Sequence, residues 1–105
     1  MRFVETPVFT RTVTALLDEE QYRALQLALA LRPEPGDLIR GSGGFRKLRW
    51  GLAGRGKRGG ARVLYSWDIP TETLFMLYAY TKQEQGDLTP QQVKVLRRLV
   101  GEEFK

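Results

Sequence analysis

The sequence predicts an α+β domain in which helices pack on a mainly antiparallel sheet, in the order β-α-α-β-β-β-α. Three segments carry apolar residues at helical spacing, and each opens with a capping residue. Three strand-like segments lie between the second and the third of these helices. A length of 105 residues with 42% hydrophobic residues suits one domain over residues 1–105 with a single modest core.

The N-terminal third is predicted to hold a short strand and two helices. Weak alternation over Met1–Glu5 indicates the strand. Thr6 followed by Pro7 is a typical helix start, because proline suits the first helical position. Asp18 opens the second helix with Gln21 as a capping-box partner, and the prolines that follow residue 32 end it. The predicted inward faces are Phe9, Val13, Leu16 and Leu17 in the first helix and Tyr22, Leu25, Ala28 and Leu29 in the second.

Three strands are predicted after the prolines. Residues 45–50 alternate, with Lys47 and Arg49 on one side and apolar residues on the other. Residues 51–60 are rich in glycine and cations and are predicted to form a long loop, after which residues 62–67 pair back as a hairpin. Residues 74–80 are apolar on both faces, which indicates a central strand under helices.

The last element is predicted to be a helix that begins at Thr89. Thr89 is a good N-cap, Pro90 suits the first position and Gln92 can reach back to the cap. Its predicted inner face consists of Val93, Leu96, Leu99 and Val100.

Composition excludes several classes of function. The chain has no cysteine and no histidine, so disulfides, thiolate or imidazole zinc sites and histidine-based catalysis are all absent. We therefore expect no metal site and no cofactor. Neither a signal-peptide core after Met1 nor a membrane-length apolar run is present, and we expect a cytoplasmic protein.

The positive charge is concentrated in one segment. Of the 17 basic residues, eight lie between Arg40 and Arg62, where no acidic residue interrupts them and eight of the eleven glycines also occur. The rest of the chain has nine basic and twelve acidic residues, a net charge of −3. Arginine and lysine on strands beside a glycine-rich loop suit a polyanion, and phosphate contacts dominate nucleic-acid affinity. Nearby aromatic residues such as Tyr80 could stack on unpaired bases if exposed, although core packing is the alternative for each.

Two other interpretations of this segment stay open. The stretch GSGGFRK suggests a nucleotide-binding loop, but it lacks the spacing of a P-loop and its lysine is not followed by Ser or Thr. A solvated basic loop without a specific role is the second.

The motifs GSGGFRKLRW, GRGKRGGARVLYSW and LFMLYAYTKQE, followed by DLTPQQ and a terminal helix, resemble the RelE/HigB group of bacterial toxins, most closely the HigB-like branch. The resemblance extends from Phe3 to the last helix and implies a RelE-like fold. It also implies a ribosome-dependent endoribonuclease that cuts mRNA in the ribosomal A site. The implied partners are mRNA, ribosomal RNA and an antitoxin, often a small helix-turn-helix protein.

Individual residues carry the resemblance with different strength. Arg62 matches the strand arginine that the family places at the scissile phosphate. Lys82 matches the basic residue that ends the family's last strand, and Lys47 matches a lysine with acid/base or charge roles. These three are the predicted catalytic residues. The predicted RNA-binding residues are Arg46, Arg49, Arg55, Lys57, Arg58 and, more weakly, Tyr80. The family's C-terminal Tyr or His has no counterpart here, so the general base is left open.

The sequence leaves two alternative functions. One is a gyrase inhibitor of the ParE type, which shares the fold and acts by protein contact; the other is a non-catalytic RNA- or ribosome-binding module. Fold alone does not separate them, because function depends on the site.

Overall fold

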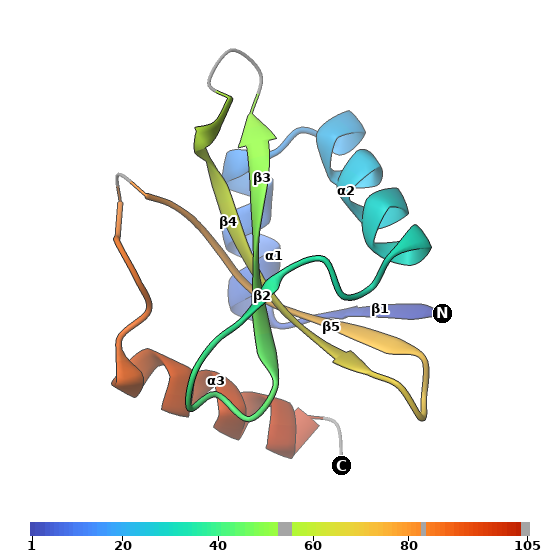
Figure 1. The fold of residues 1–105 in the computed structure, drawn as a ribbon, viewed down its shortest axis with the longest axis vertical. Coiled ribbons are helices and arrows are strands. Elements are labelled where there is room, and N and C mark those ends of the chain that lie inside the picture. The colour runs from blue at the N-terminus through green and yellow to red at the C-terminus, as the bar shows by residue number, and fades with distance from the viewer. Residues whose placement is uncertain (53–55, 83, 104–105) are drawn as a thin grey trace.

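The computed structural model describes residues 1–52, 56–82 and 84–103, with side chains described outside 52–59 and 102–103. The order is β1 (Arg2–Glu5), α1 (Pro7–Leu16), α2 (Glu19–Leu31), β2 (Asp37–Leu38), β3 (Phe45–Leu52), β4 (Gly56–Asp68), β5 (Thr73–Thr81) and α3 (Pro90–Glu103). The α+β class and the mainly antiparallel sheet are confirmed (Figure 1). The two-residue strand β2 is an addition to the predicted order.

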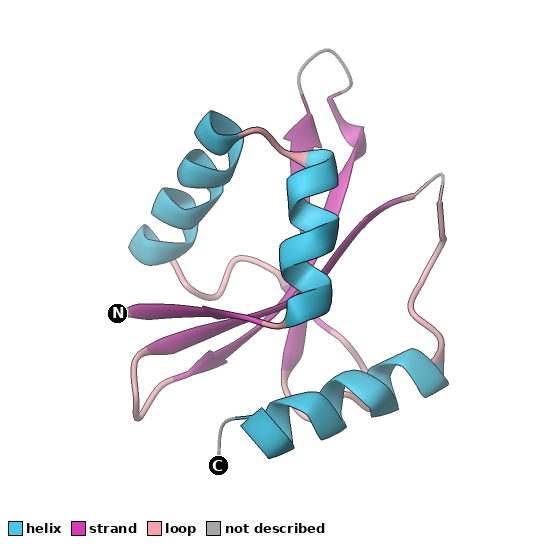
Figure 2. Ribbon diagram, turned by 180° about the vertical axis from the view of Figure 1, so that it is seen from behind, coloured by secondary structure: helices cyan, strands magenta, loops and turns pink. Residues whose placement is uncertain are grey.

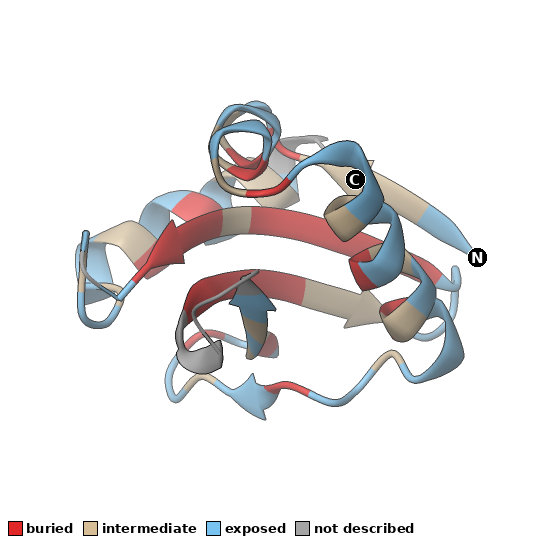
Figure 3. Ribbon diagram, turned by 90° about the horizontal axis from the view of Figure 1, so that it is seen from above, coloured by how far each residue is buried: buried red, intermediate tan, exposed pale blue. Residues whose placement is uncertain are grey.

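The sheet has the strand order β1-β5-β4-β3-β2. Only β1 pairs in parallel, with β5; the other neighbours are antiparallel. The sequence prediction of a central apolar strand is confirmed, because β5 lies between β1 and β4 and all but one of its residues are buried. Figure 3 shows the buried residues concentrated on the strands in the middle of the sheet.

The predicted helix starts are confirmed by their capping bonds. Thr6 accepts a bond from the backbone N–H of Phe9 at 3.0 Å, and Asp18 and Gln21 form the reciprocal capping box. Thr89 and Gln92 repeat that arrangement at α3, with bonds of 3.1 and 2.9 Å. These local bonds satisfy backbone donors that a helix start leaves unpaired.

The helices cover the two faces of the sheet unequally. α1 and α2 pack on one face through Phe9, Val13, Leu17, Leu25 and Leu29, and Figure 2 shows α1 in front of the strands. α3 packs on the other face through Leu96, in a cluster with Phe45, Leu64, Phe75, Leu77 and Tyr80. α3 lies across one end of the sheet (Figure 1), and a cavity lined by residues of β2, β3, β4 and β5 lies beside it.

The predicted loop over residues 51–60 is wrong at both ends. β3 continues to Leu52 and β4 begins at Gly56, with a register shift between Trp50 and Leu52. Glycine weakens a strand locally, but cross-strand pairing overrides that preference here. A Cβ on Gly60 would lie 2.2 Å from the carbonyl oxygen of Trp50, so glycine permits the close approach of the two strands at this irregularity.

Candidate nucleic-acid interface

Cross-strand pairing brings cations from β3 and β4 beside a tyrosine on β5. Arg49 pairs with Arg62, and Arg62 pairs with Tyr80. Directly opposed residues in a sheet share a face, so these three side chains form one row across three strands. Lys47 lies two residues before Arg49 and therefore on the same face. This face is the one that α3 partly covers.

A cavity of about 340 Å³ opens on this face. It lies between the sheet, the segment that follows β2 and the segment that leads into α3. Its lining combines Lys47, Arg49 and Arg40 with the aliphatic side chains of Leu38, Ile39, Leu64 and Leu88, the ring of Tyr80 and the carboxylates of Asp37 and Asp87. The cavity therefore offers cations and an apolar wall together, the combination that a nucleotide with its phosphate requires.

Tyr80 is the unusual member of this lining. Its side chain is only 1% exposed, and its buried hydroxyl has no hydrogen-bond partner among the described residues. Burial is the main cause that raises the pKa of Tyr80, with the nearby Asp87 carboxylate adding to the rise and Arg62 opposing it. The phenol therefore stays protonated and acts as a hydrogen-bond donor. A buried donor without an acceptor costs about 1–3 kcal/mol, so this hydroxyl calls for an acceptor from outside the chain.

Lys47 forms the ion pair of the site. Its Nζ lies 3.0 Å from Oδ1 of Asp87, which is 84% exposed in the segment before α3. The hydrogen bond and the charge of Lys47 lower the pKa of Asp87, and Lys82 contributes in the same direction. Lys82 therefore lies close enough to act on the same carboxylate, although it follows the end of β5.

Arg62 is held inside this face. It is 5% exposed, and its Nη1 donates to the carbonyl oxygen of Gly60 at 3.4 Å, a long bond that is not the only interaction of this residue. Arg49 beside it is exposed. A phosphate that enters the cavity would therefore touch Arg49 and Lys47 directly, while Arg62 stabilises the charge from behind.

The structure does not bring Arg46 to this site. Arg46 pairs with Tyr65, which belongs to the core cluster under α1 and α2, and its Nη1 donates to the carbonyl oxygen of Gly36 at 2.9 Å. It therefore lies on the opposite face from Lys47. Arg55 and the side chains of Lys57 and Arg58 lie outside the described residues.

The suggested stacking of a base on Tyr80 does not agree with the structure. A ring that is 1% exposed has no free face, and Tyr80 instead stacks on Tyr78 with ring centroids 5.6 Å apart and planes inclined by 26°. The alternation that puts Lys47 and Arg49 on one side of β3 is confirmed, because Leu48 and Trp50 pack on the other side against the α1–α2 cluster.

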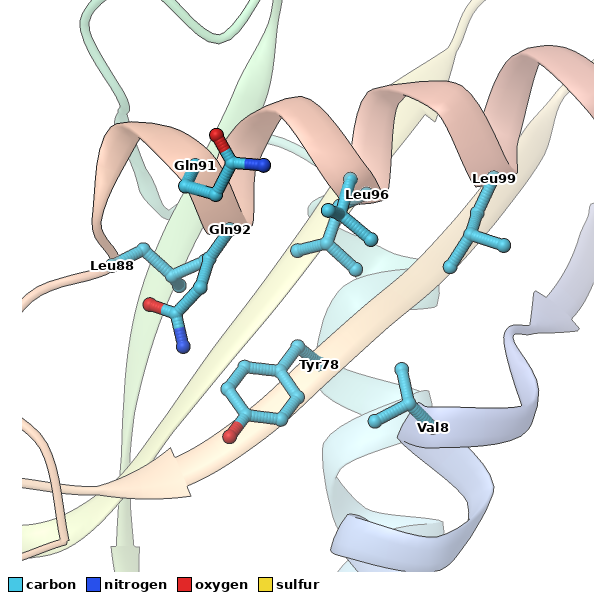
Figure 4. Close-up of a pocket in the computed structure, with 8 residues that line it drawn as sticks. Val8, Tyr78, Leu88, Gln91, Gln92, Leu96 and Leu99 are labelled. Carbon is cyan, nitrogen blue, oxygen red and sulfur yellow. The ribbon is translucent and has the colours of Figure 1, made fainter.

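A second hollow of about 340 Å³ lies between Tyr78 of β5 and α3 (Figure 4). Tyr78 faces Val8 of α1 across it, and Leu96 and Leu99 line it from α3 (Figure 4). Gln91 and Gln92 give it some polarity, but its lining has no charged side chain. It therefore supplies no group for phosphate chemistry.

Sequence reasoning missed the residues that reach the site from outside the strands. Asp87 lies 40 residues from Lys47, and Asp37 comes from the short strand β2 beside β3. Nothing in the local pattern of either aspartate points to this contact. Arg40 belongs to the cationic segment, and its charge was the one available signal.

No model of a known protein family matches the chain. In the part of the chain that the structure describes, no three acidic side chains gather where they could hold a metal ion. Within the same residues, none of the helices has the length and apolar character that crossing a membrane requires.

Proposed function

We propose that this chain is a ribosome-dependent mRNA endonuclease, the toxin of a type II toxin–antitoxin pair similar to the RelE/HigB group. The observation that carries the proposal is the row Arg49–Arg62–Tyr80 with Lys47 beside it, where the buried hydroxyl of Tyr80 has no acceptor among the described residues. Cations grouped with a hydrogen-bond donor are what phosphoryl chemistry uses to stabilise developing charge.

The proposed reaction needs only groups of the RNA and of this face. The 2′-oxygen of a ribose attacks the adjacent phosphorus, the bond from phosphorus to the 5′-oxygen breaks, and the products carry a 2′,3′-cyclic phosphate and a 5′-hydroxyl. One proton leaves the 2′-hydroxyl and one is delivered to the 5′-oxygen. Arg62 and Arg49 stabilise the extra charge on the phosphoryl oxygens, since guanidinium stays protonated. Lys47 and Lys82 are the proposed groups for the proton transfers.

In this proposal the ribosome aligns the reacting atoms of the message. In-line attack needs the 2′-oxygen, the phosphorus and the leaving oxygen to be aligned, and alignment alone can contribute several kcal/mol. A message held in the A site is bent and fixed by the ribosome, so the cationic face has only to complete the arrangement. We therefore expect little cleavage of free RNA, a cytoplasmic site of action and neutralisation by a cognate antitoxin.

Cell-free translation followed by primer extension on the message tests the proposal. The wild-type chain is expected to produce breaks at ribosome-occupied codons, and Arg49→Ala and Arg62→Ala are expected to abolish or strongly reduce them. Arg49 is exposed, so its loss tests the site without disturbing the core. Arg23→Ala, on the exposed side of α2, is the matched control and is expected to cut normally.

Two outcomes would contradict the endonuclease: arrested translation with intact message would indicate a binding module, and inhibited DNA supercoiling would indicate a gyrase inhibitor. Equal loss of cutting in the Arg23 control would contradict the assignment of the site, because it would indicate a general charge effect.

A further inference from the structure

Beside the cavity, the outer side of α3 carries a second group of cations. Val93 and Leu96 are buried against the sheet, whereas Lys94 and Arg97 are exposed and three residues apart, on one side of the helix. Arg40, in the segment that follows β2, is exposed as well. We call Arg40, Lys94 and Arg97 the α3 surface.

A glycine-rich turn leaves these cations accessible. Residues 41, 43 and 44 are glycines with positive φ angles of 75°, 78° and 116°, a conformation that side chains disfavour. The guanidinium of Arg97 lies over this turn, with Nε and Nη2 3.4 Å from the position of a Cβ built on Gly43. Without side chains on the turn, a ligand can approach both its backbone and Arg97.

The α3 surface borders a hollow of about 290 Å³, lined by Gly41, Pro90, Gln91, Val93, Lys94 and Arg97. None of these lining residues is acidic. Among the described residues the one ion pair joins Lys47 to Asp87, so no carboxylate is paired with a cation of the α3 surface. The charge of this surface is therefore available to a ligand.

The hollow and the cavity on the sheet are lined by neighbouring residues of the same two chain segments. Arg40 lines the cavity and its neighbour Gly41 lines the hollow; likewise Leu88 lines the cavity and Pro90 the hollow. The same two chain segments thus contribute to both sites. Arg40 lines the cavity while Lys94 and Arg97 line the hollow, so an RNA strand that extended from one to the other would have cations at both.

We propose that the α3 surface binds the phosphate backbone of the RNA strand beyond the nucleotides held in the cavity. This inference rests on the proposed function, which makes RNA the ligand of the cavity. It adds a second binding surface for the same RNA strand. An acidic protein segment is the other ligand that such charges accept. The neighbouring cavity, which the proposed function assigns to a phosphodiester, favours RNA.

An RNA-length series tests the proposal by fluorescence anisotropy with single-stranded oligonucleotides. One oligonucleotide of roughly three nucleotides is long enough to place a nucleotide in the cavity, and one of roughly ten is long enough to extend to α3, within the range of single-strand binding sites. Lys94→Ala/Arg97→Ala is expected to weaken binding of the long RNA and to leave the short one unchanged. For the long RNA, the slope of log K against log salt is expected to become shallower by about 1.4 in this variant, because each of the two lost phosphate contacts contributes about 0.7.

Matched controls decide the interpretation. Arg11→Ala/Arg23→Ala removes the same charge from the exposed sides of α1 and α2 and is expected to change neither RNA. Arg49→Ala, in the cavity, is expected to weaken both lengths equally. Equal weakening by the α1–α2 control, or no loss for the long RNA in the α3 variant, would overturn the proposal. So would equal binding of a polyglutamate peptide through Lys94 and Arg97. Binding is read without cleavage, so these results stand apart from a failure of the endonuclease assay.

Discussion

Replacing Tyr80 with phenylalanine is expected to stabilise the free protein and weaken its function. The substitution removes a buried hydroxyl that has no partner among the described residues and keeps the ring that packs with Leu64, Leu77 and Leu96. An unsatisfied buried polar group costs about 1–3 kcal/mol, so the free energy of unfolding should rise by up to that amount. Urea denaturation of both proteins measures the change.

The effect on RNA cleavage should have the opposite sign. If the hydroxyl donates to a phosphate oxygen, its loss removes a bond to a charged group, typically about 1.5–3 kcal/mol. At 1.4 kcal/mol for each factor of ten, kcat/KM on programmed ribosomes should fall about 10- to 150-fold.

Tyr65→Phe is the matched control, because this buried hydroxyl does have a partner. It accepts a bond from the backbone N–H of Gly36 at 3.0 Å on the other face of the sheet. Its loss should destabilise the fold by about 1–3 kcal/mol and leave cleavage by the folded protein unchanged. A Tyr80→Phe protein that is destabilised like the control, or one that cleaves at the wild-type rate, would refute the reasoning.

Three further predictions concern charge. Asp87→Asn frees Lys47 for phosphate and should tighten RNA binding in anisotropy measurements at low salt; unchanged affinity would show that the ion pair does not compete with RNA. Lys47 lowers the pKa of Asp87, so the Lys47–Asp87 ion pair stabilises the fold at pH values above the usual pKa of an aspartate. That stabilisation is lost as the pH falls through the lowered pKa. Lys47→Ala should therefore return that pKa to its usual range in an NMR titration. Burial and the Glu5 carboxylate raise the pKa of Tyr22 above its usual value near 10, so stability should fall as the pH rises beyond that value. Tyr22→Phe should flatten the alkaline limb of a thermal denaturation series, and an unchanged limb would contradict this assignment.

Local signals in the sequence predicted most of the fold. The helix starts at Thr6, Asp18 and Thr89 depend on bonds between residues three apart, which a linear pattern contains. Alternation likewise placed Lys47 and Arg49 on one face of β3. The apolar run of β5 indicated its central position, because only a strand covered on both faces can bury such residues.

The parts that were missed depend on contacts between distant segments. The loop expected at 51–60 becomes strand because pairing between β3 and β4 outweighs the local effect of glycine. Gly36 follows the prolines that end α2, and a Cβ on it would lie 2.9 Å from the carbonyl oxygen of Lys47, so this glycine permits close packing against β3, which no local pattern indicates. The ion pair of Lys47 with Asp87 and the burial of Tyr80 arise only when α3 and its preceding segment fold onto the sheet.

The central proposal is that this face cuts ribosome-bound mRNA by promoting attack of a 2′-hydroxyl on the adjacent phosphorus. The most direct measurement is single-turnover cleavage of a message held in programmed ribosomes, compared with the same message carrying a single 2′-deoxy nucleotide at the cut. We predict cleavage of the all-RNA message with a new 5′-hydroxyl end, none at the deoxy position, and almost none without ribosomes. Cleavage at the deoxy position, or equal cleavage of free RNA, would contradict the account.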